Sequence, residues 1–449
     1  MYKLFLYFFV ITFAYSQTIS FEEVLTDTLN NNNDLKNSKL DIDISSLNID
    51  EVNALNYGKL NFESQVNRTN HAGYVFNSKL SSREATFKDF GFAQMGEPMN
   101  TQPTDLNYPE ARTNINNKLT YDVALFTGFK ISTQKDIRKL EKKINTLKLN
   151  MNKRELSFEV FKAYNGAVIA KEYIKALNEA IKTVNNIVKS SSIFYKEGLI
   201  TSIDVKQAKA YKFELLANLA NAKKRFNFAI SYLRFLSSNN NITDVNNIKD
   251  IKLKLYDKSE LLQQALTKKD SIKASILYKD IMKKSIDVAK GDYYPTLYSH
   301  LEYGYNDNRY NFSDDKDYYN AVIGLKYTLF DNSREIKVQK NKINYIKAKI
   351  NHEKQINYIK MQIDNSIDDL NTKIAILSAK ISSFDLAKKI FEQANKMYKN
   401  HLISMTDLLK QKSDFEVAQA ELLNAKYQRY VAEAKVAKII NLDFLDLKD

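Results

Sequence analysis

The chain contains no cysteine, and this absence excludes disulfide bonds, thiolate metal sites, cysteine nucleophiles and a lipidated N-terminal cysteine. Its 449 residues include only 10 glycines and 4 prolines, a scarcity that favours long uninterrupted helices. With 44% hydrophobic and 27% charged residues, the chain is too apolar to be disordered throughout and can bury a substantial core.

Signatures of catalysis are also missing. The sequence has no Walker A loop, no HExxH motif and no dinucleotide-binding glycine pattern. The four histidines have no metal-ligand spacing, so surface or turn positions are predicted for them; they are His71, His300, His352 and His401. We therefore expect no enzyme activity, no cofactor and no metal site.

Positive charge is in excess, with 67 Lys and Arg against 53 Asp and Glu and a net charge of +14. Such an excess is compatible with nucleic acid or an anionic membrane as a partner. The lysines, however, are spread along helical stretches instead of forming one block, which is typical of solvated helix faces. No nucleic-acid partner is expected on this basis.

The first 16 residues have the layout of a secretory signal peptide. Lys3 precedes the apolar run from Leu4 to Ala14, and the small residues of Ala14-Tyr15-Ser16 favour cleavage before Gln17. A short buried helix is the alternative. No later apolar stretch reaches the roughly 18 residues of a membrane-spanning helix. The sequence thus predicts an exported protein without a helical membrane anchor.

A first structural repeat is predicted over residues 17–241. It starts with a helix from Ser20 to about Leu55, and alternating apolar residues then predict strands at about 60–70 and 113–126, joined by a polar loop. Beyond Gly128 the apolar period changes from two to about 3.5, which predicts a long antiparallel helical hairpin over about 129–236.

The same order of elements returns in a second repeat, residues 242–449. A helix from about Ser259 to Lys290 precedes predicted strands at about 296–306 and 319–330, and a second helical hairpin follows at about 333–441. The hairpin turns give the clearest match, because Tyr195 to Val205 aligns without gaps on Tyr398 to Leu408. An internal duplication explains this better than chance similarity between hairpins.

The predicted strands have the length and the single apolar face of strands that cross a bilayer at a tilt. A soluble sandwich would use similar strands. Export without a helical anchor favours the interpretation that these strands cross a membrane. Because the smallest single-chain barrels have about eight strands and lipid does not tolerate open sheet edges, a chain with only four membrane strands must assemble with other chains.

At this point the sequence resembles the TolC family of outer-membrane efflux and secretion channels. The resemblance covers nearly all of residues 17–449 and is most specific in the two hairpin turns, the strand end Leu325 to Phe330 and the segment Tyr293-Tyr294-Pro295. It implies a mainly α-helical fold with membrane β-strands. In a homotrimer of this kind, the strands form one shared barrel of twelve in the outer membrane, and the helices form a tunnel in the periplasm.

The family closes its periplasmic end with a constriction beside the second hairpin turn. The resemblance implies that Asp407 is the acidic residue of this constriction, that Asp204 is its first-repeat equivalent and that Tyr398 is the tyrosine that holds the helices closed. Lys410 replaces a second acid and Ile403 replaces the arginine latch, so a double acidic ring is not expected. Asp204 and Asp407 also have the spacing of helix N-terminal caps.

Contact with a periplasmic adaptor protein is the other role that the resemblance gives to the hairpin turns. Five candidates are Gly198, Leu199, Ile200, Leu402 and Ser404, although ordinary turn residues would give the same pattern. His401 stands where the family usually has glycine, so a second turn of different shape is expected.

The sequence therefore predicts a passive exit duct of a tripartite efflux or type I secretion system, located in the outer membrane with its helices in the periplasm. Its expected partners are two further copies, outer-membrane lipid, a periplasmic adaptor and an inner-membrane transporter of the RND, ABC or MFS type. Drugs, metals, toxins and unfolded proteins all stay open as cargo. The rival is an exported coiled-coil structural or adhesive protein without a channel.

Overall fold

The computed structural model describes residues 17–251, 258–310 and 315–444, so the predicted signal peptide at residues 1–16 lies outside it. The chain forms two compact units. The first comprises the described parts of Met1–Ile42, Lys143–Ile276 and Ile350–Asp449, and the second comprises Asp43–Lys142 and Leu277–Lys349.

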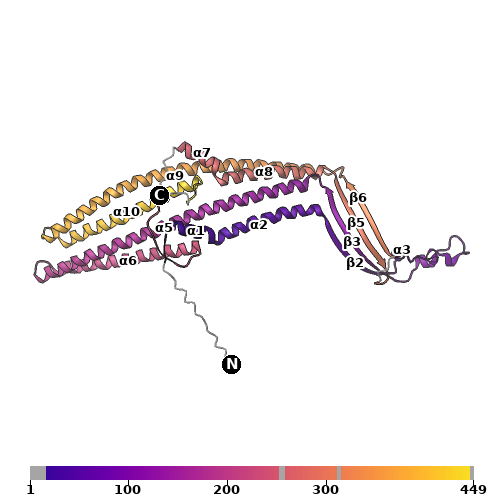
Figure 1. Ribbon diagram of the computed structural model, residues 1–449, viewed down its shortest axis with the longest axis horizontal. Helices are drawn as coiled ribbons and strands as arrows, with labels where there is room; N and C mark the ends of the chain where they lie inside the picture. The colour runs from indigo at the N-terminus through magenta and orange to yellow at the C-terminus, as the bar shows by residue number, and fades with distance from the viewer. Residues whose placement is uncertain (1–16, 252–257, 311–314, 445–449) are drawn as a thin grey trace, which may run out of the picture. The chain divides into compact units, whose positions relative to one another are not determined.

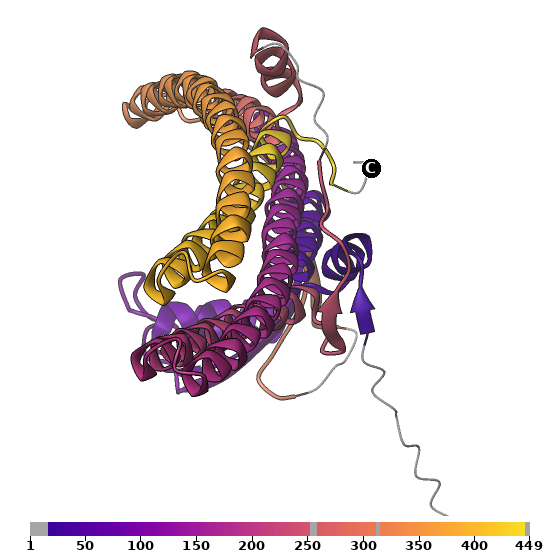
Figure 2. The ribbon, with the colours of Figure 1, turned by 90° about the vertical axis from the view of Figure 1, so that its left-hand side faces the viewer.

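Two antiparallel helical hairpins make up most of the first unit (Figure 1). One joins α5 (Lys130–Lys196) to α6 (Ser202–Ser237), and the other joins α9 (Ser333–Lys399) to α10 (Met405–Ile439). Figure 2 looks onto their turns and shows the two hairpins side by side, with α10 against α6. These helices lie where the change of apolar period and the internal repeat predict hairpins, at about 129–236 and 333–441.

A small parallel sheet that the sequence analysis did not predict closes the core of this unit. Strand β1 (Gln17–Ile19) pairs with β4 (Ile242–Val245). Against it lie the fully buried rings of Phe161 and Tyr164 from α5, and the Tyr164 hydroxyl donates to the backbone oxygen of Ile19 at 3.3 Å. Strands of three and four residues are too short to show a period of two in the sequence.

The single helix predicted from Ser20 to Leu55 is interrupted at Asn32, which separates α1 (Phe21–Asn31) from α2 (Asn33–Ala54). The backbone of Asn32 is extended, and its side-chain oxygen accepts from the backbone N–H of Asp34 at 2.9 Å. Its side-chain nitrogen donates to the backbone oxygen of Leu236 at 3.0 Å. Asparagine competes well for backbone partners, so a cap replaces the expected continuous helix.

The helix predicted from Ser259 to Lys290 is also interrupted, at Lys269, between α7 (Lys258–Lys268) and α8 (Asp270–Lys290). The interruption brings the buried Asp270 carboxylate into an ion pair with Arg154 of α5. Periodicity within the segment could not reveal it, because this partner lies 116 positions away.

The second unit contains a four-stranded antiparallel sheet in the order β2-β3-β5-β6. Its strands are β2 (Lys59–Thr69), β3 (Arg112–Phe126), β5 (Thr296–Asp307) and β6 (Asp317–Lys326). The fourth strand was predicted to reach Phe330 but ends at Lys326, which pairs with Thr296. The residue before Thr296 is Pro295, which has no N–H to extend the ladder.

The polar loop predicted between β2 and β3 contains helical turns. They are α3 (Ala72–Ser81), the 3-10 turns Phe87–Phe90 and Phe92–Gln94, and α4 (Thr104–Asn107). Among the described residues no helix has both the length and the apolar character needed to cross a membrane. The predicted fold class, mainly α with a β-sheet, is confirmed; assembly of several chains stays a prediction.

Candidate functional site

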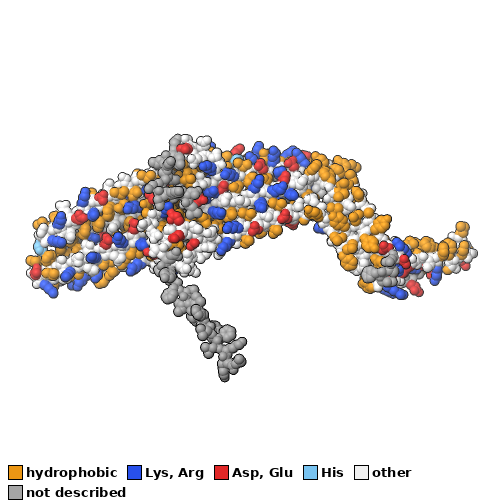
Figure 3. Space-filling view, viewed as in Figure 1, with side chains coloured by type: hydrophobic (Ala, Val, Ile, Leu, Met, Phe, Trp, Pro, Cys, Tyr) orange, Lys and Arg blue, Asp and Glu red, His pale blue; other side chains and the backbone are white. Residues whose placement is uncertain are grey.

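The four-stranded sheet carries different chemistry on its two faces. Strand register aligns Phe62 with Leu119, Leu119 with Tyr303, and Tyr303 with Tyr319, so one row of apolar side chains crosses all four strands. All four of these side chains are exposed, and Figure 3 shows hydrophobic side chains covering much of the strand region. A large exposed apolar surface of this kind marks a contact with lipid or with another protein.

Charged and polar side chains occupy the opposite face. The Lys118 ammonium lies 3.4 Å from Glu63 and 3.5 Å from Glu302. One ring nitrogen of His300 lies 2.6 Å from the Asp122 carboxylate. These pairs join three neighbouring strands across one face, which is thus suited to contact with water. The side chain of His300 is 29% exposed. No group of three potential ligands that could hold a metal occurs in the described part of the chain.

Within the described residues, both outer strands of the sheet lack a partner strand on one side. Strands β2 and β6 are the first and last in the order, so each presents unpaired backbone N–H and C=O groups. Lipid does not tolerate such edges because it supplies no hydrogen-bonding groups.

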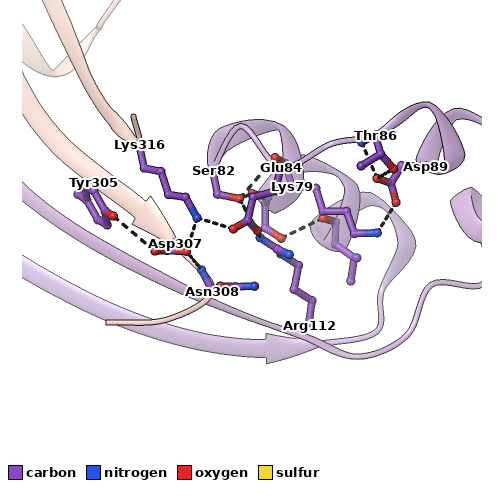
Figure 4. Close-up of polar contacts among 12 residues, drawn as sticks. Lys79, Ser82, Glu84, Thr86, Asp89, Arg112, Tyr305, Asp307, Asn308 and Lys316 are labelled. Carbon is purple, nitrogen blue, oxygen red and sulfur yellow. Dashed lines mark hydrogen bonds and ion pairs between the residues drawn. The ribbon is translucent and has the colours of Figure 1, made fainter. Parts of the chain in front are cut away.

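A cluster of charged residues fastens the segment after β2 to the ends of the other strands (Figure 4). The Glu84 carboxylate pairs with both Arg112 and Lys316, and Lys316 also lies 2.7 Å from Asp307. Burial acts to raise the pKa of Glu84, but its hydrogen bonds from Lys316 and Arg112 outweigh burial and the pKa is lowered. The cluster thus stabilises the ionised carboxylate and holds the segment in place.

The two hairpin turns place Asp204 and Asp407 in the same geometry. The hydroxyl of Ser404 and a carboxylate oxygen of Asp407 lie 2.7 Å apart, and the Asp407 N–H donates to the Ser404 hydroxyl at 3.1 Å. Thr201 and Asp204 repeat these contacts at 2.7 and 3.4 Å. Both pairs are capping boxes, as their spacing predicts. Asp407 is exposed and Asp204 is half-buried, so capping leaves the Asp407 charge accessible.

Tyr398 is buried, unlike its first-repeat counterpart Tyr195, which is 50% exposed. Its hydroxyl lies 3.3 Å from that of Ser191 in α5, so it connects the two hairpins of one chain, and burial raises the pKa of its phenol. Lys410 is exposed on α10, one turn beyond Asp407. The turn therefore brings Asp407 and Lys410 onto the exposed surface and directs Tyr398 inward.

The expected difference in shape between the two turns is not found. Gly198 and His401 both have positive φ, 75° and 58°. The next N–H in each turn, that of Leu199 or Leu402, donates over 2.9 Å to the carbonyl five residues earlier. The hydrogen bonds of the turn thus hold His401 in the left-handed conformation despite its side chain. Leu199 and Leu402 are 55% and 67% exposed, while Ile200 is half-buried and Ser404 exposed.

A buried ion pair near the second turn was missed from the sequence. Lys412 is 3% exposed, lies 2.5 Å from Glu416 and sits over the rings of Phe391 and Phe415. Burial raises the pKa of the Glu416 carboxyl despite its lysine partner. The spacing of lysine and glutamate by four residues was a signal, but the same spacing is common on solvated helices.

Comparison with known families finds a similarity in the second half of the chain. Residues 261–442 match the model of the family described as "Outer membrane efflux protein". The match covers 182 of the 449 residues. No curated protein matches the chain.

Solved structures with the same fold cover nearly the whole chain. CusC has a TM-score of 0.77 and 13% identity, with 94% of this chain and 92% of that chain covered. The CmeC outer membrane channel of Campylobacter jejuni has a TM-score of 0.76 and 16% identity, with coverage of 94% and 85%. The MtrE outer membrane channel of Neisseria gonorrhoeae has a TM-score of 0.73 and 14% identity, with 94% of this chain and 89% of that chain covered.

The resemblance inferred from the sequence is thereby supported by a family match over residues 261–442, and the fold is confirmed for nearly the whole chain. The family's description agrees with the predicted outer-membrane location and efflux role. The CmeC and MtrE structures are described as outer membrane channels. The alternative of an exported coiled-coil protein without a channel gains no support.

Proposed function

We propose that the chain is one subunit of a passive homotrimeric exit duct in the outer membrane, which performs no chemistry itself. The observation that carries this proposal is the four-stranded sheet with one apolar face, one charged face and two open edges. A barrel built from such sheets would turn the apolar face to lipid and the charged face to a water-filled lumen.

The open edges give the physical reason for assembly. Strand β6 of one copy would pair with β2 of the next, and this pairing would satisfy the backbone groups that lipid leaves unpaired. Closure therefore needs only copies of this chain. The number three comes from the family resemblance, as does the continuation of the duct by the helical hairpins in the periplasm.

Asp407, Lys410, Tyr398 and Asp204 are the proposed constriction residues of this duct. The exposed carboxylate of Asp407 can face the tunnel while it caps α10. Three copies of Asp407 near one axis would attract cations, and the neighbouring Lys410 would weaken that attraction. Tyr398 would not line the tunnel itself but would hold the two hairpins together through its contact with Ser191.

The exposed turn residues fit a docking role at the periplasmic end. Leu199 and Leu402 present large apolar side chains to solvent, and burial of apolar surface against a partner protein favours association. With Gly198, Ile200 and Ser404 they form the proposed contact with a periplasmic adaptor. An inner-membrane transporter of the RND, ABC or MFS type would then supply the energy for efflux or type I secretion, and residues 1–16 would direct export.

Membrane fractionation followed by native mass measurement tests the proposal. We expect the chain in the outer-membrane fraction and, after mild detergent extraction, a particle of three times the chain mass of 52.0 kDa. In planar bilayers this particle should conduct ions. A water-soluble monomer or dimer would contradict the channel assignment.

A further inference from the structure

A basic cavity lies in the first unit, apart from the sheet and from the hairpin turns. It has a volume of about 410 Å³ and is bounded by α5, α9, the end of α10 and the junction of α7 with α8. Four cationic side chains line it, together with one carboxylate, that of Glu155. They are Arg154, Lys269, Lys435 and Lys438.

The carboxylates nearby neutralise only two of these four cations. Asp270 pairs with Arg154, and Glu155 lies 3.0 Å from Lys438. Lys269 donates to the backbone oxygen of Ile439 at 3.1 Å, and Lys435 is exposed with no ion pair among the described residues. Two positive charges are therefore left over, which is the complement of a dianion.

Ser366 supplies an independent observation. This residue of α9 lines the cavity and is 2% exposed, yet its hydroxyl has no hydrogen-bond partner within the described chain. Buried hydroxyls are rarely left without a partner, because desolvation then costs about 1–3 kcal/mol. A polar ligand in the cavity would supply the missing partner.

The electrostatics of Lys269 agree with an anion at this place. Burial and the like charges of Lys438 and Arg154 together lower its pKa to about 8, against opposite contributions from Glu155 and Asp270. An anion beside the ammonium group would reverse this shift.

We propose that this cavity is a binding site for a phosphate group, either free phosphate or a small phosphorylated compound. The ammonium groups of Lys269 and Lys435 would supply the charge, and the Ser366 hydroxyl would donate a hydrogen bond. Phosphate fits because its double charge matches the excess and because its oxygens accept several charge-assisted hydrogen bonds. The apolar side chains of Met151 and Ile359 in the lining leave room for an organic portion.

Calorimetric titration of the full chain in detergent tests this site, at pH 7 and constant ionic strength. Inorganic phosphate and glycerol 3-phosphate are the probes, and chloride is the reference anion. We expect saturable binding of phosphate, and tighter binding of glycerol 3-phosphate would identify a phosphorylated compound as the preferred ligand. Equal or weaker binding would identify free phosphate.

Two variants locate the binding. Lys269→Met should raise the Kd about tenfold, because one charge-assisted contact is lost, and Ser366→Ala should raise it about threefold, because one neutral hydrogen bond is lost. The control Lys396→Met removes an exposed lysine from the same helix as Ser366 and should leave the Kd unchanged. Absence of phosphate binding by the wild type, or an unchanged Kd in either cavity variant, would overturn the proposal.

Discussion

The hydroxyl oxygens of Tyr398 and Ser191 lie 3.3 Å apart, and both side chains are buried. The Ser191 hydroxyl donates to the backbone oxygen of Ile187 at 2.8 Å, so Tyr398 is the donor in the bond between them. This bond joins α9 to α5, the long helices of the two hairpins. Any movement that separates the hairpin turns must break it.

Tyr398→Phe should therefore favour separation of the hairpins. Loss of one buried hydrogen bond lowers the free energy of unfolding by about 1 kcal/mol, and we expect the conductance of the assembled channel in planar bilayers to rise. The matched control is Tyr195→Phe, at the equivalent but exposed position in the first turn. Equal conductance of both variants would show that the Tyr398 hydroxyl does not hold the channel closed.

Asp407→Asn should reduce the preference of the channel for cations, because it removes a charge from the proposed constriction. The reversal potential in a salt gradient measures this preference. Ser404→Ala controls for the cap, since it removes the bond to Asp407 and keeps the charge. It should cost about 1 kcal/mol of stability and leave selectivity intact.

Asp204→Asn, at a half-buried position, should have a smaller effect on selectivity than Asp407→Asn. The pore role is wrong if the Asp407→Asn and Ser404→Ala variants have the same selectivity as the wild type.

The local sequence predicted those parts of the fold whose causes are local. The long helices follow from an apolar period of about 3.5, and the caps of Asp204 and Asp407 follow from residues three positions apart. The break at Asn32 was missed because its side chain bonds to Leu236, 204 positions away. The residues around Asn32 therefore give no indication of this partner.

In the candidate site, too, the local sequence predicted some features, while others depend on residues far apart in the chain. The positions of Asp407 and Lys410 on an exposed turn could be inferred from the duplicated turn sequence, but the partner of Tyr398 could not, since Ser191 lies 207 positions away. The opposite chemistry of the two sheet faces required the strand register, which places Lys118 between Glu63 and Glu302.

Glu84→Gln should loosen the segment between β2 and β3. Arg112 would lose its carboxylate partner, whereas Lys316 would keep Asp307. A partly buried charge that loses its partner costs on the order of 1–3 kcal/mol. Limited proteolysis should then cut within residues 72–108 faster than in the wild type. Glu110→Gln, an exposed site in the same segment, should leave the rate unchanged.

Acid should act on this segment as the glutamine variant does. The lowered pKa of Glu84 means that its contribution to stability is present above the unfolded pKa of about 4.5 and is lost as the pH falls through the folded value. Cleavage in the wild type should therefore accelerate below about pH 4.5, with little further change in Glu84→Gln. An identical acid response of wild type and variant would exclude this role of Glu84.

Glu433 should make the protein less stable as the pH rises. Burial raises the pKa of its carboxyl to about 7, although Arg429 opposes this shift and Asp250 adds to it. The folded state therefore holds the proton more tightly than the unfolded state between about pH 4.5 and 7, and stability falls as the pH rises across that interval.

Glu433→Gln should remove this fall in stability. It should also raise the free energy of unfolding at pH 8 by on the order of 2 kcal/mol relative to wild type, as measured by denaturant unfolding in detergent. Glu392→Gln, at an exposed position on α9, should leave the pH profile unchanged. A Glu433→Gln profile that still falls between these pH values would place the responsible carboxyl elsewhere, because glutamine cannot titrate.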